Sequence, residues 1–214
     1  MTRRLYVAIL IVPFSCFLSA RATSAQTQAP GVAKGDVFYY QMYGVYTSSD
    51  PDAVIVVPPF EANNTQWVRI EITDVSGSTI YHVYTLHFVN GTEQIINGKT
   101  DLTRSLNFSS SFAGVPICAA NLTAGDKIST VQLTINETVI RSYPGSERET
   151  NYVSWNSSED WGRIYFDKKT GVLVDLYRAH SFVNPTTHEV TEKADVVKMT
   201  AFTHPLNYHY VEDP

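Results

Sequence analysis

The chain has 214 residues and a formal net charge of −5. The first 25 residues, which are considered below as a removable segment, hold Arg3, Arg4 and Arg21 and no acidic residue. Without them, 13 basic side chains remain against 21 acidic ones, which gives a formal charge near −8. Such a surface repels phosphate backbones and no basic run reverses this, so nucleic acid binding is excluded. Beyond those 25 residues Cys118 is the only cysteine, which excludes an intrachain disulfide.

The first 25 residues have the layout of a secretory signal peptide. Two arginines form its positive start, residues 5–18 are mostly apolar, and small residues then offer cleavage after residue 22 or after residue 25. The apolar stretch is shorter than the ~20 residues that a membrane-spanning helix needs, which favours cleavage over an uncut anchor. We expect a secreted or cell-surface protein with no membrane span after cleavage.

The rest of the chain is expected to form one domain. Residues 26–35 are small, polar and proline-bearing, which is typical of a flexible lead-in. Residues 36–203 contain no repeat, charge run or linker that would divide them, and they are expected to form an antiparallel β domain. Residues 204–214 are left as a C-terminal tail.

Strand patterns recur along the first part of this domain, where Val, Ile, Phe and Tyr are frequent and apolar positions alternate with polar ones. The strands expected there are residues 36–46, 66–73, 79–89 and 92–96. Residues 47–64 are expected to be an irregular loop. Asn90-Gly91 and Asn97-Gly98 both predict turns, because Asn and Gly tolerate positive φ. Residues 79–89 are apolar on both faces, which favours a central strand that is covered on both sides.

The second part continues in the same way. Its expected strands are residues 127–140, 148–155, 163–166, 172–179 and 190–202. Turns are predicted where Gly or Pro interrupts them, at Ala124-Gly125-Asp126, Pro144-Gly145, residues 167–171 and Asn184-Pro185. No window is typical of a capped amphipathic helix. The sequence therefore predicts an all-β, single antiparallel domain, either a curved half-barrel-like sheet or a β-sandwich.

Six Asn-x-Ser/Thr sequons follow the signal peptide, whereas composition alone would supply roughly two. The expected glycosylation sites are Asn63, Asn90, Asn107, Asn121, Asn136 and Asn156. A sequon is modified only in an exported chain and at an exposed position. Five of the six fall in predicted loops and turns, while Asn136 falls in or at the end of a predicted strand and must face solvent. Many sequons without a disulfide fit an archaeal cell-surface protein better than a eukaryotic secreted domain.

Short motifs in the second part resemble a group of uncharacterised archaeal exported or membrane-anchored β-sheet domains. The motifs are Gly125-Asp126, residues 135–138 (Ile-Asn-Glu-Thr), residues 143–151 (Tyr-Pro-Gly-Ser-Glu-Arg-Glu-Thr-Asn) and residues 165–173 (Tyr-Phe-Asp-Lys-Lys-Thr-Gly-Val-Leu). The last of them is similar to a hairpin of the lipoprotein-carrier (LolA-like) half-barrels. That resemblance implies an exported β domain whose curved sheet could shelter an acyl chain, and it carries over no catalytic residue.

The sequence offers no catalytic constellation, so we expect a protein that is not an enzyme and takes no cofactor or metal. A G-x-S-x-G elbow and a Gly-rich phosphate loop are both missing from the sequence. His82 and His87 fall on opposite faces of one strand, whereas His180 and His188 could face each other across a turn without a Cys or carboxylate cluster to complete a site. Cys118 lies in an apolar run and is expected to be a buried structural thiol.

Aromatic residues crowd two of the predicted strands, and core packing or cross-strand ladders account for most of them. They are Phe38, Tyr39, Tyr40, Tyr43, Tyr46, Tyr81, Tyr84 and Phe88. The functional reading of these rings is an apolar cavity or a contact surface.

The leading expectation for the role is a non-enzymatic, N-glycosylated secreted or cell-surface protein with a structural or interaction role. Its partners would be cell-envelope proteins or further copies of itself. The alternative is a module that binds a hydrophobic ligand or lipid on a curved sheet. A secreted hydrolase is third, because acids such as Glu159 and Asp160 are present and glycoside cleavage needs only a pair of carboxylates.

Overall fold

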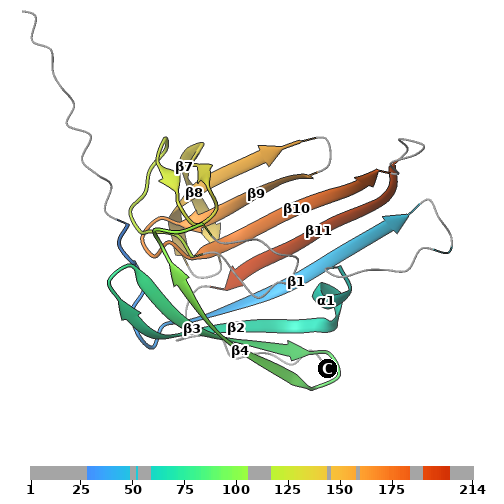
Figure 1. The fold of residues 1–214 in the computed structure, drawn as a ribbon, viewed down its shortest axis with the longest axis horizontal. Coiled ribbons are helices and arrows are strands. Elements are labelled where there is room, and N and C mark those ends of the chain that lie inside the picture. Colours follow the sequence, from blue (N-terminus) through green and yellow to red (C-terminus); the bar gives the residue numbers. More distant parts are fainter. Residues whose placement is uncertain are drawn as a thin grey trace, which may run out of the picture.

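Strands make up most of the computed structural model of this protein, which describes residues 28–48, 52, 59–105, 117–143, 146–157, 160–183 and 190–202 (Figure 1). The strands are β1 Val37–Ser48, β2 Thr65–Ser76, β3 Thr79–Phe88, β4 Glu93–Asp101, β5 Lys127–Ile128, β6 Leu133–Thr134, β7 Glu137–Tyr143, β8 Ser146–Asn156, β9 Asp160–Asp167, β10 Leu173–Val183 and β11 Val190–Phe202. The single helix within these ranges is α1, Pro59–Asn64. The prediction of an all-β chain is confirmed.

Nine strands form one antiparallel sheet in the order β4-β3-β2-β1-β11-β10-β9-β8-β7. It consists of two meanders, β1 to β4 and β7 to β11, which are joined where β1 pairs with β11. The sheet bends, and its edge strands β4 and β7 do not pair with each other, so it stays open (Figure 1). One dominant curved sheet fits the half-barrel-like prediction. A sandwich would need a second sheet of similar size, and the other described sheet holds only β5 and β6.

The core lies on one side of this sheet, which we call the inner face. The predicted apolar positions of β2 point into it, since Val68, Ile70 and Ile72 are all 4% exposed or less. Residues 117–122 and the β5–β6 hairpin contribute further buried side chains to the same core, among them Ile117, Leu122 and Ile128. Cys118 is also buried there as a free thiol, so the prediction of a structural cysteine is confirmed.

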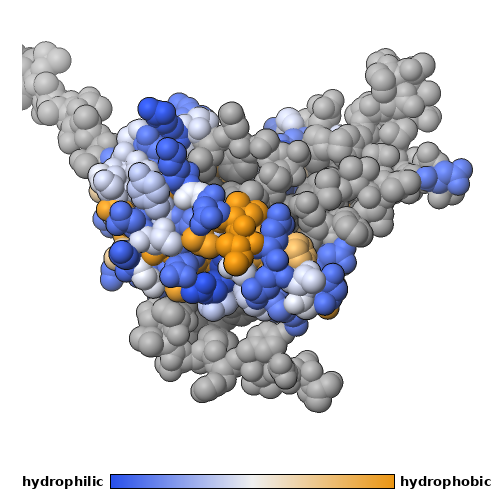
Figure 2. Space-filling view, turned by 60° about the horizontal axis from the view of Figure 1, so that its bottom comes forward, coloured by the Kyte–Doolittle hydropathy of each residue, from blue (hydrophilic) through white to orange (hydrophobic). Residues whose placement is uncertain are grey.

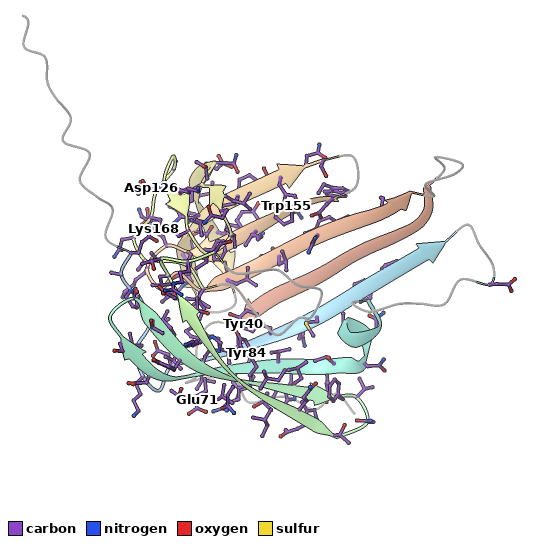
Figure 3. The ribbon with its side chains drawn as sticks, viewed as in Figure 1. Tyr40, Glu71, Tyr84, Asp126, Trp155 and Lys168 are labelled. Atoms are coloured by element: carbon purple, nitrogen blue, oxygen red, sulfur yellow. The ribbon has the colours of Figure 1, made fainter. Side chains whose placement is uncertain are left out.

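Two tyrosines lie in the middle of this core (Figure 3). Tyr40 of β1 and Tyr84 of β3 are 0% and 1% exposed. The Tyr40 hydroxyl donates a hydrogen bond of 3.0 Å to the carbonyl oxygen of Leu173, the first residue of β10. Because a buried hydroxyl without a partner would cost free energy, this bond both satisfies the tyrosine and ties the two meanders together.

Residues 28–35 are held against the domain. Val32 is 7% exposed within the core, and the carbonyl oxygen of Ala29 accepts a hydrogen bond of 2.9 Å from the Ala120 backbone. A Cβ added to Gly31 would lie 2.7 Å from the side chain of Ala120. The backbone at Gly31 therefore lies directly against Ala120. These residues of the expected lead-in therefore pack against the domain in the structure.

The predicted turn at Asn97-Gly98 is wrong, because both residues lie inside β4. Gly98 pairs in register with His82 of β3, which is 4% exposed. A Cβ on Gly98 would lie 2.9 Å from the His82 Nδ1 atom. The glycine is needed for the space that the buried imidazole occupies. Asn90-Gly91 does form its predicted turn, with Gly91 at φ 81°.

The single strand predicted over residues 127–140 is also wrong. The chain turns over residues 129–132, where Gln132 adopts φ 57°, and this turn separates β5 from β6 before β7 begins. Apolar and polar residues alternate through both arms of the β5–β6 hairpin, so this periodicity gave no sign of the turn between them. The loop predicted over residues 47–64 likewise contains α1, which begins at Pro59 because helices favour proline in their first position.

The prediction that β3 is covered on both sides is only half right. Ile80, His82 and Tyr84 on its inner face are buried, whereas Tyr81 on the other face is 40% exposed. β3 is second from the edge of the sheet and not central, so its outer face stays accessible to solvent.

Several expectations concern residues outside the described ranges. They are the signal peptide, the tail at 204–214, the turns at Pro144-Gly145 and Asn184-Pro185, the sequon at Asn107, and the candidate residues Glu159 and His188.

Candidate functional site

All five sequon asparagines that the structure describes are exposed. They are Asn63, Asn90, Asn121, Asn136 and Asn156. Asn136 immediately precedes β7 and so lies outside a strand, Asn156 is the last residue of β8, and Asn63 lies in α1 and not in the predicted loop. A sequon must be exposed to be glycosylated, and all five of these asparagines meet that condition. Their glycosylation stays a prediction.

Four of these five lie toward one end of the sheet. The antiparallel order brings the start of β2, the β3–β4 turn, the start of β7 and the end of β8 to that end. In Figure 1 the start of β2, the β3–β4 turn and the end of β8 lie on the right, where α1 is drawn. The sequons beside these four points are Asn63, Asn90, Asn136 and Asn156. We call this part of the molecule the sequon end.

Asn90 and Asn136 both present their amide nitrogen in the same way. Oδ1 of Asn90 accepts hydrogen bonds from the Thr92 backbone at 3.0 Å and from the Thr92 hydroxyl at 2.7 Å. Oδ1 of Asn136 accepts one of 2.9 Å from the Ser154 backbone. In each case the oxygen fixes the plane of the carboxamide, and Nδ2, the atom that would carry a glycan, has no part in the bond.

Asn63 differs, because both ends of its amide bind the backbone of Gly44. Oδ1 accepts from the Gly44 N–H at 3.0 Å and Nδ2 donates to the Gly44 carbonyl oxygen at 2.7 Å. The register of β1 on β11 shifts next to Gly44, and the described pairing of β1 with β2 ends at Tyr40. Asn63 therefore takes the place of a strand partner and joins α1 to β1.

Asn121 lies at the opposite end of the sheet. Its backbone N–H donates a bond of 2.7 Å to the Lys168 carbonyl oxygen in the β9–β10 turn, and it adopts φ 58°, a conformation that Asn tolerates better than most residues. Figure 3 shows Lys168 and Asp126 at this end and Trp155 toward the sequon end.

The side of the sheet opposite the core, the outer face, is rich in rings and charges. Tyr43 of β1 and Tyr177 of β10 occupy the same register row on either side of β11, and residues in one row of a sheet share a face. Tyr177 pairs in turn with Arg163 of β9. Seven large hydrophobic side chains are exposed in the described ranges, and those on the outer face are Tyr39, Tyr43, Tyr81, Ile95 and Trp161.

The predicted aromatic clusters thus divide by strand alternation. Tyr40 and Tyr84 fill the core, whereas Tyr39, Tyr43 and Tyr81 are 39%, 58% and 40% exposed. Aromatic side chains exposed on one face of a sheet are a feature of contact surfaces, because rings provide large area at low entropic cost.

On the first meander, Trp67 is the centre of an aromatic stack. Its ring is parallel to that of His87 at 4.7 Å, and Tyr39 meets it edge-on at 5.9 Å. His87 Nδ1 lies 3.1 Å from a carboxylate oxygen of Glu93. His82, in contrast, is buried in the core, so the two histidines do face opposite sides as predicted. Figure 2, which looks toward the lower edge of Figure 1, shows a separate apolar patch bordered by hydrophilic residues; its orange colour marks strongly hydrophobic side chains, which do not include Trp, Tyr or His.

On the second meander, a shallow cleft of about 430 Å³ lies where β8 and β9 meet at the sequon end. It is lined by Tyr152, Ser154, Trp155, Asn156, Trp161, Gly162 and Arg163. Trp161 is 39% exposed. Its ring lies 4.9 Å from that of Tyr177, and the Arg163 guanidinium stands 5.3 Å above the same tyrosine.

Sequence reasoning did not find this cleft. The signal was present, since two of the three tryptophans of the chain, Trp155 and Trp161, flank the sequon at Asn156. That both residues line one cleft depends on the pairing of β8 with β9, in which Asn156 stands opposite Trp161 and Trp155 opposite Gly162. A side chain on Gly162 would collide with Trp155.

Arg148, Asp167 and Thr170, which lie in the short motifs of the second part of the chain, form a structural network at the other end of the sheet. Arg148 donates to the buried carboxylate of Asp167, and Asp167 also accepts from the Thr170 backbone and hydroxyl, each at 2.8 Å. Burial alone would raise the pKa of Asp167, but the bonds from Arg148 and Thr170 outweigh it and lower this pKa. The motif therefore stabilises the β9–β10 turn, which ends at Gly171 with φ 72°.

Several groups that could be reactive are engaged in the fold. Burial lowers the pKa of His82 to about 4, and its Nε2 lies 3.1 Å from the Thr100 hydroxyl. Burial raises the pKa of the Cys118 thiol. Asp160 accepts two bonds from Arg178, at 2.9 and 3.0 Å. Among the described residues, no three His, Cys, Asp or Glu side chains gather where they could hold a metal ion.

Comparisons with protein families, with curated proteins and with solved structures find no match to this chain. Within the ranges that the structure describes, none of the helical segments has the length and apolar character needed to cross a membrane.

Proposed function

We propose that this protein is an exported, N-glycosylated, non-enzymatic cell-surface protein with a structural or interaction role in the cell envelope or an extracellular assembly. The observation that carries the proposal is the position of the sequons. All five described ones are exposed, and four gather at one end of an open sheet. Glycans there would cover that end and direct protein contacts to the outer face.

The outer face supports the interaction role. Tyr39, Tyr43 and Trp67 lie on the central strands β1 and β2, near the junction of the two meanders. Tyr and Trp are enriched at the centres of protein interfaces. The partner expected from this surface is another envelope protein or a second copy of the chain.

The non-enzymatic part rests on what the titratable side chains do. Asp167 serves a turn, Asp160 pairs with Arg178, and His82 and Cys118 are buried. Each of these groups has a structural task, and a catalytic acid, base or nucleophile would need access to a substrate. The resemblance of the motifs around residues 143–173 to archaeal exported domains supports the same location.

The other two roles have less support. A carrier of hydrophobic ligands would need a lined cavity on the inner face, where Tyr40, Ile70 and Tyr84 instead pack together in the core. A hydrolase would need converging carboxylates, and the residues that line the β8–β9 cleft include none.

The test is purification of the full chain from the surface of its native cells, followed by mass spectrometry of glycopeptides and imaging for polymers. We expect an N-terminus at residue 23 or 26, glycans at several of the predicted asparagines, and association with other envelope components. An unmodified, monomeric protein in the cytosol would overturn the proposal.

A further inference from the structure

The β8–β9 cleft has an attachment point for a ligand on its own wall. Asn156 lines it and is exposed, and Asn156 pairs in register with Trp161 across the two strands. Cβ atoms of directly opposed residues are about 4.5–5.5 Å apart in an antiparallel sheet. A group bonded to the Asn156 amide therefore starts close to the Cβ atom of Trp161, whose indole lines the same cleft.

The indole of Trp161 is partly exposed and is packed against a neighbouring ring. Trp161 is tilted 41° against Tyr177 at a ring distance of 4.9 Å, and Arg163 over Tyr177 supports the tyrosine from the same face. An exposed, well-supported indole offers a flat apolar platform with a polar N–H at its edge. Sugar rings suit such a platform, because one face of a pyranose carries mainly C–H groups while its rim carries hydroxyls.

Polar groups stand where those hydroxyls would lie. Ser154 and Arg163 pair in register two positions along each strand from the Asn156–Trp161 pair, and both line the cleft. The guanidinium has five N–H donors in a fixed fork, which suits hydroxyl or carboxylate oxygens of a sugar. The volume of about 430 Å³ is at the lower end of the range of roughly 300–1,000 Å³ for small-molecule sites.

From this geometry we propose that the cleft is the docking site of the N-glycan on Asn156. Its first sugar packs on the indole of Trp161, and the next sugar reaches Arg163 and Ser154. The inference rests on the proposed function, since it needs the glycan to be attached. It adds that this glycan is part of the folded structure and not a free chain in solvent.

A thermodynamic cycle on the full, exported chain tests the contact. Ser158→Ala removes the sequon and leaves Asn156 in place, and it is made with Trp161 and with Trp161→Ala. With the tryptophan, loss of the glycan should lower Tm by about 2–4 °C; with alanine it should change Tm by less than about 1 °C. Trp161→Tyr, which keeps a ring, should restore most of the difference, and this variant guards against a general loss of folding in Trp161→Ala.

NMR spectroscopy gives a direct readout on the same proteins. Protons of the sugar linked to Asn156 should shift upfield by the ring current of Trp161, and the shift should vanish in Trp161→Ala. Equal Tm losses in both backgrounds, or sugar shifts like those of a free glycopeptide, would overturn docking while the glycosylation stands.

Mass spectrometry of the purified protein separates the two levels of the proposal. Absence of a glycan at Asn156 would overturn the docking inference together with this sequon's part in the proposed function. Binding of a free oligosaccharide that is as tight with the glycan as without it would show that an external ligand uses the cleft, and would also overturn the inference.

Discussion

Arg148 and Asp167 form an ion pair between β8 and β9 in which the carboxylate side chain is only 2% exposed and the arginine 22%. A second pair of the same meander, Arg178 with Asp160, is 44% and 31% exposed. The two pairs have the same chemistry and differ in solvent contact, so they allow a matched comparison of a buried and a surface ion pair.

Arg148→Ala should destabilise the domain by about 3–5 kcal/mol, because it leaves the buried Asp167 charge without its partner. Arg178→Ala should cost about 1 kcal/mol or less, since its pair is screened by water. Urea unfolding at pH 7 measures both. Equal losses in the two variants would show that Thr170 alone satisfies Asp167.

The pH dependence of the first pair follows from the lowered pKa of Asp167. A carboxyl whose pKa is lower in the folded state contributes stability above its unfolded pKa, about 3.9, and loses it as the pH falls through the folded value. The gap between wild type and Arg148→Ala should therefore be full at pH 7 and shrink below about pH 4. A gap that is constant down to pH 2.5 would contradict this.

Gly98→Ala should destabilise the domain by about 2 kcal/mol or more, because the new Cβ overlaps the imidazole of His82 in a packed core. The control is Gly77→Ala, where φ is 58° and nothing lies within 4 Å of the new Cβ; its cost of about 1–2 kcal/mol is backbone strain alone. Combining Gly98→Ala with His82→Ala should recover part of the loss. Additive losses in that double variant would rule out the collision.

Because burial lowers the folded-state pKa of His82 to about 4, the free energy of unfolding should decrease as the pH is lowered from 6.5 to 4. Over that range the unfolded chain binds more protons than the folded one, so acidification costs up to about 3 kcal/mol. His82→Gln keeps a polar partner for Thr100 and should remove this part of the decline, whereas His87→Gln on the outer face should leave it in place. An unchanged slope in His82→Gln would assign the decline to other groups.

Local sequence patterns predicted many of the individual strands, but they did not predict how the strands pair in the sheet. The final strand has the predicted bounds, Val190–Phe202. The turn predicted at Asn97-Gly98 was wrong because the role of that glycine depends on His82, a residue 16 positions away in the sequence. The pairing of β1 with β11 has no local signal at all, since it joins segments from opposite ends of the domain.

The candidate site shows the same division. Sequons can be read from the sequence, and so can their need for exposure. That four of them share one end of the sheet depends on strand order. The cleft beside Asn156 depends on the register that sets Trp161 opposite it, and residue spacing along the chain does not reveal that register.

The two edge strands each begin next to a sequon. Asn136 immediately precedes β7, and Asn90 lies in the turn that leads into β4. Unpaired edges invite association with other strands, and on β7 the side chain of Ile140 is 69% exposed. Glycans at these two positions would obstruct edge-to-edge pairing.

If Asn90 and Asn136 carry glycans, as the proposed function implies, Asn90→Gln combined with Asn136→Gln should shift the exported protein toward oligomers. The matched control removes two other sequons, with Asn121→Gln and Asn156→Gln. Light scattering during size-exclusion chromatography measures the masses. The same distribution in both double variants would mean that glycan number, and not position at an edge, governs association.

Asn63 should be the least occupied of the described sequons in the folded protein. Its two bonds to Gly44 use the amide hydrogen on the same side as Oδ1, and a sugar on a trans amide takes that position. The cis form costs about 2.5 kcal/mol. Glycopeptide mass spectrometry should find Asn63 largely unmodified and Asn90 occupied. Full occupancy at Asn63 would show that α1 does not keep this contact after modification.

The pairing of β1 with β11 fixes when the sheet can be completed. A chain that crosses a membrane from its N-terminus delivers β1 first and β11 last, so the middle of the sheet stays unfilled until the final strand emerges. Until then β1 and β10 both have a bare edge, and β1 could accept β11 from a neighbouring copy that crosses at the same time. Exchange of the last strand between copies would join them without any new contact surface, through bonds that the monomer already makes within itself.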